Sequence, residues 1–286
     1  MFIATPDFLT AENLLNVGIQ AAVVAVLAFG MTFVIVAGGI DLSVGSVAAL
    51  AAIVAGWSSV SLGLPGPLVL LVGLATGLLV GMVNGAAVAY IGLPAFIATL
   101  AMLSIARGLA LVVSEGAPLM MPGTVVLLGE DLGPLPVPVL ILVVAGLVAA
   151  FVLARTVVGR SMYAVGGNRE AARLSGLPVQ RITVVVYALS GLFAGLAGLL
   201  LAGRLASAQP QAAFGYELDA IAAVVIGGAS LAGGLGKVSG TLIGALVLAV
   251  IRNGLNLLNV TAFWQQVVIG LVIAVAVAVD VLRRRR

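Results

Sequence analysis

The sequence predicts an all-helical membrane protein with many spans, and three observations support this fold class. Of the 286 residues, 63% are hydrophobic and only 8% are charged, whereas about 25% of the residues in a soluble domain are charged. The mean hydropathy of +1.30 agrees, because a soluble fold would lack the charges needed to cover its surface. The apolar stretches are long and continuous, which favours transmembrane helices over the alternating strands of a barrel.

Residue types that carry much of enzyme chemistry are missing from the sequence. The chain has no Cys and no His, so we expect no disulfide, no thiolate nucleophile, no Cys- or His-ligated metal and no Ser-His-Asp triad. The net charge of +3 does not indicate nucleic-acid binding, because four of the 13 basic residues form one C-terminal run at 283–286. We therefore predict no cofactor, no metal and no nucleic-acid partner.

Nine apolar segments are candidate spans, since a helix that crosses the bilayer needs about 20 residues. Connections rich in Gly and Pro, such as 63–67 and 116–136, separate several of them. The seventh candidate is short and flanked by glycines, which indicates a broken or partial span. The candidates are 14–37, 44–62, 68–90, 96–113, 137–153, 182–201, 218–231, 238–258 and 263–282.

The distribution of basic residues predicts the orientation. The polar segment 155–181 contains five arginines and one acidic residue, Glu170, and short loops rich in Lys and Arg stay on the cytoplasmic side. Four candidate spans follow it, so the C-terminal run at 283–286 should also be cytoplasmic. About five spans precede it, which places Met1 outside although no cleavable signal precedes the first apolar run. We expect that one candidate is misread or that a first helix is absent from the chain.

Two glycine-containing segments resemble each other weakly. Residues 36–43 read VAGGIDLS, residues 226–233 read IGGASLAG, and each precedes an apolar segment rich in small residues. Paired helix breaks indicate a transporter with internal repeats, although Gly-Gly could also recur by chance among 37 glycines. The candidate helix-break and pathway residues are Gly38, Gly39, Asp41, Ser43, Asp219, Gly227 and Gly228.

Ionisable residues within apolar segments have two interpretations. Asp41, Asp219, Arg107 and Arg252 either serve an ion pathway or act as caps, snorkelling side chains or ion-pair partners. We favour the structural interpretation for all four. A row of glycines at four-residue steps, 73, 77, 81 and 85, predicts close packing of one helix against another.

The segment Gly234-Leu235-Gly236-Lys237 resembles part of a phosphate-binding loop but fails the full pattern. The motif requires Gly at position 231 and Ser or Thr at position 238, where this chain has Leu and Val. We therefore expect no nucleotide site in this chain. Active transport would then draw on an ion gradient or on a separate ATPase subunit.

A short helix outside the bilayer is predicted at 168–176. Asn168 is a favourable N-cap, Glu170 lies in the first turn, and Gly176 is a natural C-cap that Pro178 follows. A chain this poor in polar residues gains little from such an element unless a partner docks on it. The alternative is an ordered connecting loop.

The segment Glu170-Ala171-Ala172-x-x-x-Gly176 resembles the EAA-xxx-G coupling motif of ABC-importer permeases. The wider chain resembles the permease subunits of monosaccharide importers of the ribose type. The matching segments follow the order of that family and include GGIDLSVGS at 38–46. They lie at 8–14, 30–46, 95–100, 107–108, 159–176, 208–210, 215–225, 227–234 and 253–257.

This resemblance implies the permease subunit of an ABC importer with a type II-like fold, and not an enzyme. Family members have about ten spans with both ends inside, so this chain would have about nine in a single domain, 1–286, with a coupling loop at 155–181. The implied partners are ABC ATPase subunits, a periplasmic sugar-binding protein, a second permease copy (identical or a sister chain) and the lipid bilayer of the bacterial inner membrane. The implied ATPase-coupling residues are Asn168, Arg169, Glu170, Ala171, Ala172, Arg173 and Gly176. The alternatives are a secondary transporter driven by an ion gradient and a non-transporting membrane scaffold.

Overall fold

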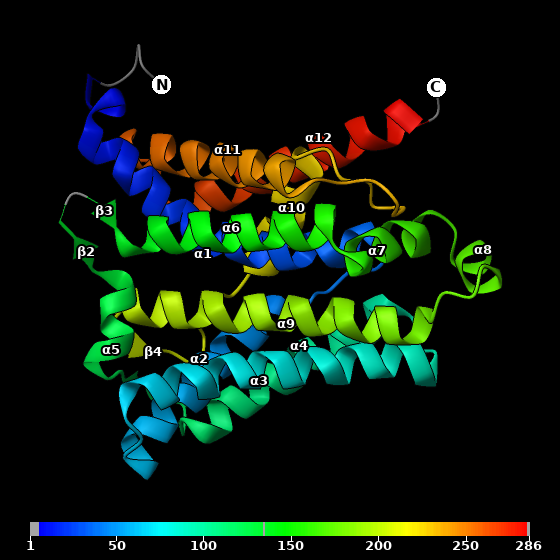
Figure 1. Ribbon diagram of the computed structural model, residues 1–286. Coiled ribbons are helices and arrows are strands. Elements are labelled where there is room, and N and C mark those ends of the chain that lie inside the picture. Colours follow the sequence, from blue (N-terminus) through cyan, green and yellow to red (C-terminus); the bar gives the residue numbers. More distant parts are fainter. Residues whose placement is uncertain (1–5, 134, 285–286) are drawn as a thin grey trace.

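The computed structural model describes residues 6–133 and 135–284 and consists almost entirely of helices that run side by side (Figure 1). The long helices are α1 (Ala11–Val36), α2 (Val44–Leu62), α3 (Gly66–Ala86), α4 (Ala95–Val113), α6 (Val137–Arg155), α9 (Val179–Arg204), α11 (Val238–Leu257) and α12 (Ala262–Arg284). The short helices are α5 (Gly123–Val126), α7 (Val157–Gly167), α8 (Arg169–Leu174) and α10 (Tyr216–Ile226), with 3-10 turns at Pro6–Leu9 and Leu127–Gly129 and a π-helical extension of α3 at Ala87–Ile91.

The all-helical, many-span class is confirmed, but the nine candidate spans are not all full-length helices. Seven helices in the described part of the chain are long and apolar enough to cross a membrane: α1, α2, α3 with its extension, α4, α6, α9 and α11. The seventh candidate forms α10, whose 11 residues reach only about 16 Å at 1.5 Å per residue, roughly half of the hydrocarbon thickness. The ninth candidate lies in α12, where the described apolar stretch is Phe263–Val275.

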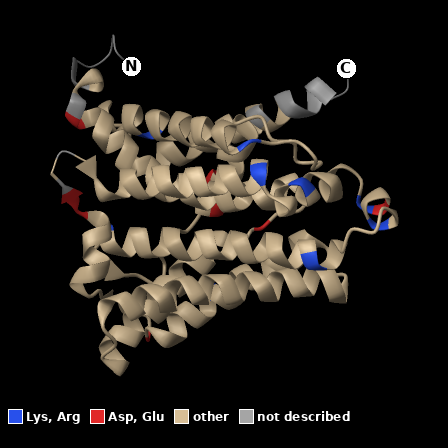
Figure 2. Ribbon diagram, in the orientation of Figure 1, with Lys and Arg blue, Asp and Glu red and all other residues tan. Residues whose placement is uncertain are grey.

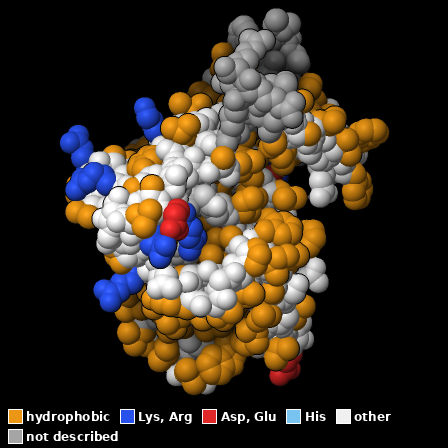
Figure 3. Space-filling model, turned by 90° about the vertical axis from the view of Figure 1, so that its right-hand side faces the viewer, with side chains coloured by type: hydrophobic (Ala, Val, Ile, Leu, Met, Phe, Trp, Pro, Cys, Tyr) orange, Lys and Arg blue, Asp and Glu red, His pale blue; other side chains and the backbone are white. Residues whose placement is uncertain are grey.

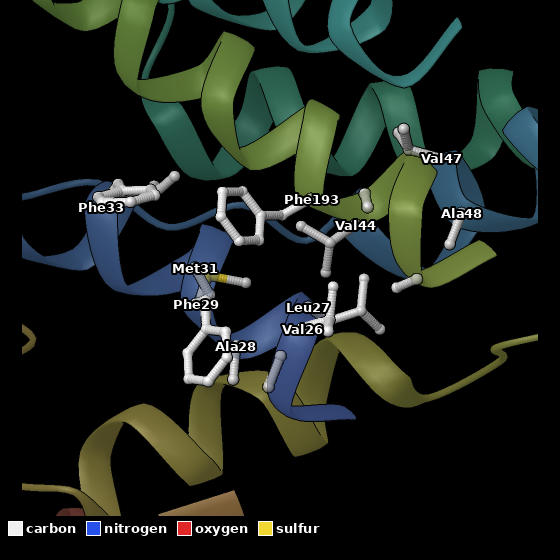
Figure 4. Packing of buried hydrophobic residues seen from close by; sticks show 14 of the residues in the cluster. Val26, Leu27, Ala28, Phe29, Met31, Phe33, Val44, Val47, Ala48 and Phe193 are labelled. Atoms are coloured by element: carbon white, nitrogen blue, oxygen red, sulfur yellow. The ribbon is translucent and has the colours of Figure 1, made fainter. Parts of the chain in front are cut away.

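Helix α1 lies at the centre of the bundle. In its most apolar window 89% of the residues are buried, against 22% in α3 and in α4, and α1 packs against α6, α9, α10 and α11. A helix that is apolar on all sides is expected in such a place. Its aromatic side chains join the core in Figure 4, where the rings of Phe33 and Phe193 meet edge to face with centroids 5.8 Å apart.

The glycine row of α3 packs against α9, as its spacing predicts. A Cβ atom at Gly77 would overlap the carbonyl oxygen of Gly191, and one at Gly81 would overlap that of Tyr187. The two backbones approach this closely because α3 carries only glycines at these positions, and α9 places Gly191 and Gly195 opposite Gly77. The prediction of close helix packing is confirmed.

The two ends of the bundle differ. At one end lie two small antiparallel ladders, β1 (Leu119–Met120) with β4 (Ser207–Ala208) and β2 (Asp131–Leu132) with β3 (Leu135–Pro136). At the other end lie α7 and α8, and α8 projects beyond the long helices (Figure 1). Figure 2 shows that Lys and Arg gather mainly toward the end that carries α7 and α8.

Candidate functional site

Helix α8 is a single short helix with well-defined caps at both ends. The side-chain oxygen of Asn168 accepts a hydrogen bond from the amide N–H of Ala171 at 2.9 Å. At the other end the amide N–H of Leu177 donates to the carbonyl of Ala172 (3.1 Å), and that of Gly176 donates to Arg173 (3.0 Å). With φ of +82° at Gly176, this is the Schellman arrangement in which glycine is favoured. The helix predicted at 168–176 is therefore confirmed, including both caps.

Most side chains of α8 face away from the rest of the protein. Asn168, Arg169, Glu170, Ala171 and Arg173 are exposed, and Ala172 is buried. Glu170 and Arg173 form an ion pair of 2.6 Å one helical turn apart, and the Arg173 guanidinium lowers the pKa of the Glu170 carboxyl through its hydrogen bonds.

An apolar side chain at the end of α8 is also exposed. The side chain of Leu174 is 76% exposed although it lies outside every candidate span. Figure 3 looks onto this end of the molecule and shows acidic atoms beside basic ones. A charged pair beside an exposed leucine is a surface that a protein partner could cover.

The sequence analysis treated 155–167 as part of a loop, so helix α7 was not predicted. The Thr156 side chain caps it by accepting from the amide of Gly159 at 3.1 Å. Its buried face includes Met162 and Val165, three residues apart, while Arg160 on the other side is exposed. The Thr cap and this apolar spacing were the signals in the sequence that could have revealed it.

The end of α7 is packed tightly against both predicted helix breaks. A Cβ atom at Gly166 would overlap the carbonyl oxygen of Val36 and would lie 2.7 Å from the amide nitrogen of Gly234. A Cβ at Gly233 would lie 2.6 Å from the carbonyl oxygen of Gly166 and 2.9 Å from the Cα of Gly38. We call these four residues, Gly38, Gly166, Gly233 and Gly234, the glycine junction.

Two hydrogen bonds fasten the glycine junction. The amide of Gly234 donates to the carbonyl of Val36 at 2.9 Å, so the first of the two similar segments is bonded to the residue that directly follows the second. The Tyr163 hydroxyl of α7 donates to the carbonyl of Gly236 at 2.6 Å. Burial raises the pKa of Tyr163, which keeps its hydroxyl protonated and able to donate.

The first helix break, between α1 and α2, is held by buried polar side chains. Asp41 is 2% exposed, and its carboxylate accepts from the Ser43 amide (2.9 Å), the Ser43 hydroxyl (2.6 Å) and the Ser190 hydroxyl (2.9 Å). The Asn84 amide donates to the Ser43 hydroxyl at 2.9 Å. Asp41 therefore stabilises the turn in which it lies and connects this turn to α9 through Ser190, while Ser43 connects it to α3 through Asn84. These bonds agree with a structural role for Asp41 rather than a role in an ion pathway.

The second break follows α10 and is built from glycine backbone. Gly227 ends the helix, and a Cβ there would overlap the backbone of Gly240 in α11; Gly228 has φ of +87°. Asp219 lies upstream on α10 and forms an ion pair of 2.6 Å with Arg252. Asp219 is therefore set apart from the glycines with which the sequence analysis grouped it.

Arg107 and Arg169 reach elements distant in sequence. The Arg107 guanidinium donates to the carbonyls of Pro210 and Ala212 at 2.7 and 2.9 Å, which agrees with a structural capping role. Arg169 of α8 lines a small cavity of about 40 Å³ together with Gly38 and Gly39. The cavity places a residue of the exposed helix beside the first break.

Comparisons with known proteins agree along nearly the whole chain. The family model described as "Branched-chain amino acid transport system / permease component" matches residues 13–277. The chain is 46% identical over 286 residues to the ribose import permease of Haemophilus influenzae, which covers 96% of this chain and 87% of that protein. It is 47% identical over 283 residues to the ribose import permease of Escherichia coli K12 (96% and 88%) and 36% identical over 342 residues to the xylose transport system permease of the same strain (98% and 87%).

No solved structure gives a significant match to the chain. The family match spans more than half of the chain, and the identity to the relatives is high over most of their length. The chain therefore belongs to the family of transport-system permease components that includes the ribose and xylose import permeases.

Proposed function

We propose that this chain is the transmembrane permease subunit of an ATP-binding-cassette importer that translocates a monosaccharide, a ribose-like pentose or a related sugar. Similarity to import permeases for ribose at 46–47% identity and for xylose at 36% supports the sugar assignment. The chain supplies the membrane path as one permease domain, and hydrolysis takes place in a separate subunit, because its phosphate-loop-like segment lacks the Gly and the Ser or Thr that the motif requires.

The proposed assembly contains two permeases, identical or sister chains, two ABC ATPase subunits and a periplasmic sugar-binding protein that delivers the substrate. It resides in the bacterial inner membrane. Loop 155–181 and the C-terminus face the cytoplasm in this proposal, because the arginine-rich loop obeys the positive-inside rule in that orientation. The binding protein would then meet the opposite end of the bundle, where the two small ladders lie.

Helix α8 is the proposed contact with the ATPase. The observation that carries the proposal is a rigid, doubly capped helix whose charged side chains and Leu174 face outward at the cytoplasmic end. Asn168, Arg169, Glu170, Ala171, Ala172, Arg173 and Gly176 are its proposed coupling residues. An isolated helix of six residues would not be stable in water, so the caps and the docking of Ala172 are what keep it formed.

The glycine junction is the proposed route from α8 into the membrane. Closure of the ATPase on ATP is a two-state event, and only a stiff connection can turn it into movement of the spans. Helix α7 leads directly into α8 and touches the end of α1 and the loop between α10 and α11 through backbone rather than through flexible side chains. A displacement of α8 would therefore be transmitted to both helix breaks at the same time.

The two breaks are the proposed moving parts beside the sugar pathway. Gly38, Gly39, Gly227 and Gly228 provide the backbone freedom that a gate requires, and Asp41 and Ser43 hold the first break in register. The glycines at the two breaks are small and neutral, so a neutral sugar could pass beside them without desolvating a fixed charge there.

A secondary transporter driven by an ion gradient is the competing function. The feature in its favour is the buried Asp41 carboxylate, which has no ion-pair partner among the described residues. Such a transporter would accumulate sugar without any ATPase in response to a proton or sodium gradient. The similarity to import permeases does not favour it.

The test is ATP-driven uptake of D-ribose by liposomes that contain the chain with its co-purified ATPase and binding protein. We expect Glu170→Gln to reduce uptake while ATP hydrolysis continues. The matched control is Glu130→Gln, an exposed acid that directly precedes β2 at the opposite end of the bundle, which should leave the ratio of sugar transported to ATP hydrolysed unchanged. Normal uptake by Glu170→Gln, or uptake that needs an ion gradient and no ATP, would overturn the proposal.

A further inference from the structure

We propose that the chain holds its sugar during passage in a polar cavity between α1, α10, α11 and α12. This inference rests on the proposed function and names a binding station for it. The cavity has a volume of about 260 Å³, slightly below the roughly 300–1,000 Å³ of pockets for drug-sized ligands. Its polar lining consists of Gln20, Arg204, Asp219, Arg252, Asn256 and Gln265.

The ion pair in the cavity leaves hydrogen-bonding capacity unused. Asp219 uses one carboxylate oxygen and Arg252 one nitrogen in their contact of 2.6 Å. Neither side chain makes another hydrogen bond with the residues that the structure describes. Ionisable groups within membrane helices mark substrate pathways. The free oxygen of Asp219 and the free N–H groups of Arg252 can serve a ligand without breaking the pair.

The amide side chains in the cavity are similarly under-used. Gln20 makes no side-chain hydrogen bond within the described part of the chain, and it lines the cavity from α1. Gln265 donates to the side-chain oxygen of Asn256 (2.7 Å) and to the carbonyl of Val260 (2.8 Å). This leaves the Asn256 amide group as a donor and the Gln265 oxygen as an acceptor for a bound molecule.

This set of groups matches a neutral polyhydroxyl ligand. A sugar hydroxyl donates and accepts at once, so it can bridge a carboxylate, a guanidinium and an amide. The Tyr216 ring also lines the cavity, and the Arg252 guanidinium carbon lies over it, 6.0 Å from the ring centroid, so the ring adds an aromatic wall beside the polar groups. Few polar groups beside an aromatic wall are typical of small-molecule sites.

An adjoining cavity extends the station. Its volume is about 400 Å³, and it shares Tyr216, Asp219, Arg252 and Gln265 with the first cavity. Its remaining walls are mainly apolar, from α10 and α12. The shared residues therefore line both cavities, so a sugar that moves from one cavity to the other would keep hydrogen-bonding partners on the way.

A sugar is favoured over a zwitterionic amino acid because the acid of the cavity is already paired. Asp219 and Arg252 neutralise each other, and Arg204, the other charged lining residue, is exposed and donates to the carbonyl of Ile19 at 3.4 Å. The ammonium group of a zwitterion would have to compete with Arg252 for the Asp219 carboxylate. A sugar needs only the atoms that the pair leaves free.

The absence of Cys from the sequence allows a direct test by single-cysteine labelling. In the purified complex, a Gln20→Cys variant should react with a water-soluble thiosulfonate reagent, and D-ribose should slow the reaction several-fold. L-leucine at the same concentration should not slow it. The control is Ser61→Cys, exposed near the end of α2, whose labelling should not respond to ribose.

A second variant measures the binding itself. In the Gln20→Cys background, Asn256→Ala should raise the ribose concentration that gives half-maximal protection about fivefold, which corresponds to the loss of one hydrogen bond. The control Gln211→Ala, in an exposed loop, should leave this concentration unchanged. No labelling at position 20, no protection by ribose, or protection by leucine instead would overturn the inference. Labelling needs no ATP hydrolysis, so ATP-driven uptake without protection refutes the station alone, whereas failure of uptake in the unsubstituted chain refutes the proposed function.

Discussion

The amide nitrogen of Gly234 donates a hydrogen bond to the carbonyl oxygen of Val36, 2.9 Å away. Val36 is the last residue of α1, and Gly234 lies in the loop between α10 and α11. The bond therefore ties one helix break to the other. Gly166 of α7 lies against both partners, so the element that leads into the exposed helix α8 is in contact with both breaks.

We expect Gly166→Ala to disturb this contact and to uncouple hydrolysis from transport. Its Cβ would overlap the Val36 carbonyl, and relieving such overpacking costs about 1–3 kcal/mol. The ratio of ribose transported to ATP hydrolysed should fall in liposomes. The control is the neighbouring Gly167→Ala, where a Cβ meets nothing within 4 Å; equal ratios for the two variants would count against the junction.

Replacement of Gly176 should loosen the C-terminal end of α8. Its φ of +82° is unfavourable for an L-residue, so Gly176→Ala should cost about 1 kcal/mol, whereas Gly176→Asn should cost less because Asn tolerates this conformation. Hydrogen exchange of the amides of 172–177 measures the effect. Gly108→Ala, at an open helical position, is the control. Equal exchange in Gly176→Ala and the unsubstituted protein would show that this cap does not hold the helix.

The ion pair in α8 should give the helix a pH dependence of definite sign. Arg173 holds the pKa of Glu170 below its ordinary value, so the folded helix favours the ionised carboxyl. This stabilisation is fully present above the ordinary carboxyl pKa and is lost as the pH falls through the lowered one. After correction for intrinsic rates, the hydrogen exchange rates of the α8 amides should be constant from neutral pH upward and should increase at acidic pH. The Glu170→Gln variant should not show this increase. If the increase persists in Glu170→Gln, a group other than Glu170 causes it, and the prediction is wrong.

The polar network around Asp41 should stabilise the bundle more than it serves proton transfer. Ser190→Ala removes one of the donors to the buried carboxylate and should cost about 1–3 kcal/mol, because a buried acceptor loses its partner. Ser61→Ala, at an exposed position of α2, should be neutral. Thermal unfolding in detergent compares the two. Asp41→Asn should retain ATP-driven uptake in the folded fraction, and a complete loss of uptake with normal folding would favour an ion relay.

Local features of the sequence were sufficient to predict the elements that depend on neighbouring residues. Asn168 and Gly176 cap α8 as expected, since caps are set within a few residues. The glycine row in α3 predicted close packing because its spacing alone exposes the backbone. The partner, α9, could not be named, since nothing local specifies which helix faces the row.

Features that depend on distant contacts were missed. The glycine junction joins three segments of the chain, and sequence similarity between two of them gave no sign that they touch or that Gly166 lies between them. Asp219 was grouped with the helix-break residues, whereas its partner is Arg252, one helix further along the chain. Helix α7 was overlooked because its basic residues outweighed a short apolar spacing. The short α10, by contrast, agrees with the broken or partial span that the flanking glycines indicated, since it ends at Gly227.

Single-cysteine cross-linking of α8 tests the central claim most directly, because the chain contains no other cysteine. Leu174→Cys and, as a control at the opposite end of the bundle, Glu130→Cys would each be treated with a short thiol-to-amine cross-linker in the assembled complex. The account predicts that Cys at 174 joins to the ATPase, with a yield that changes on ATP binding, and that Cys at 130 does not. A cross-link to the ATPase from position 130, or none from position 174 in a complex that hydrolyses ATP, would contradict it.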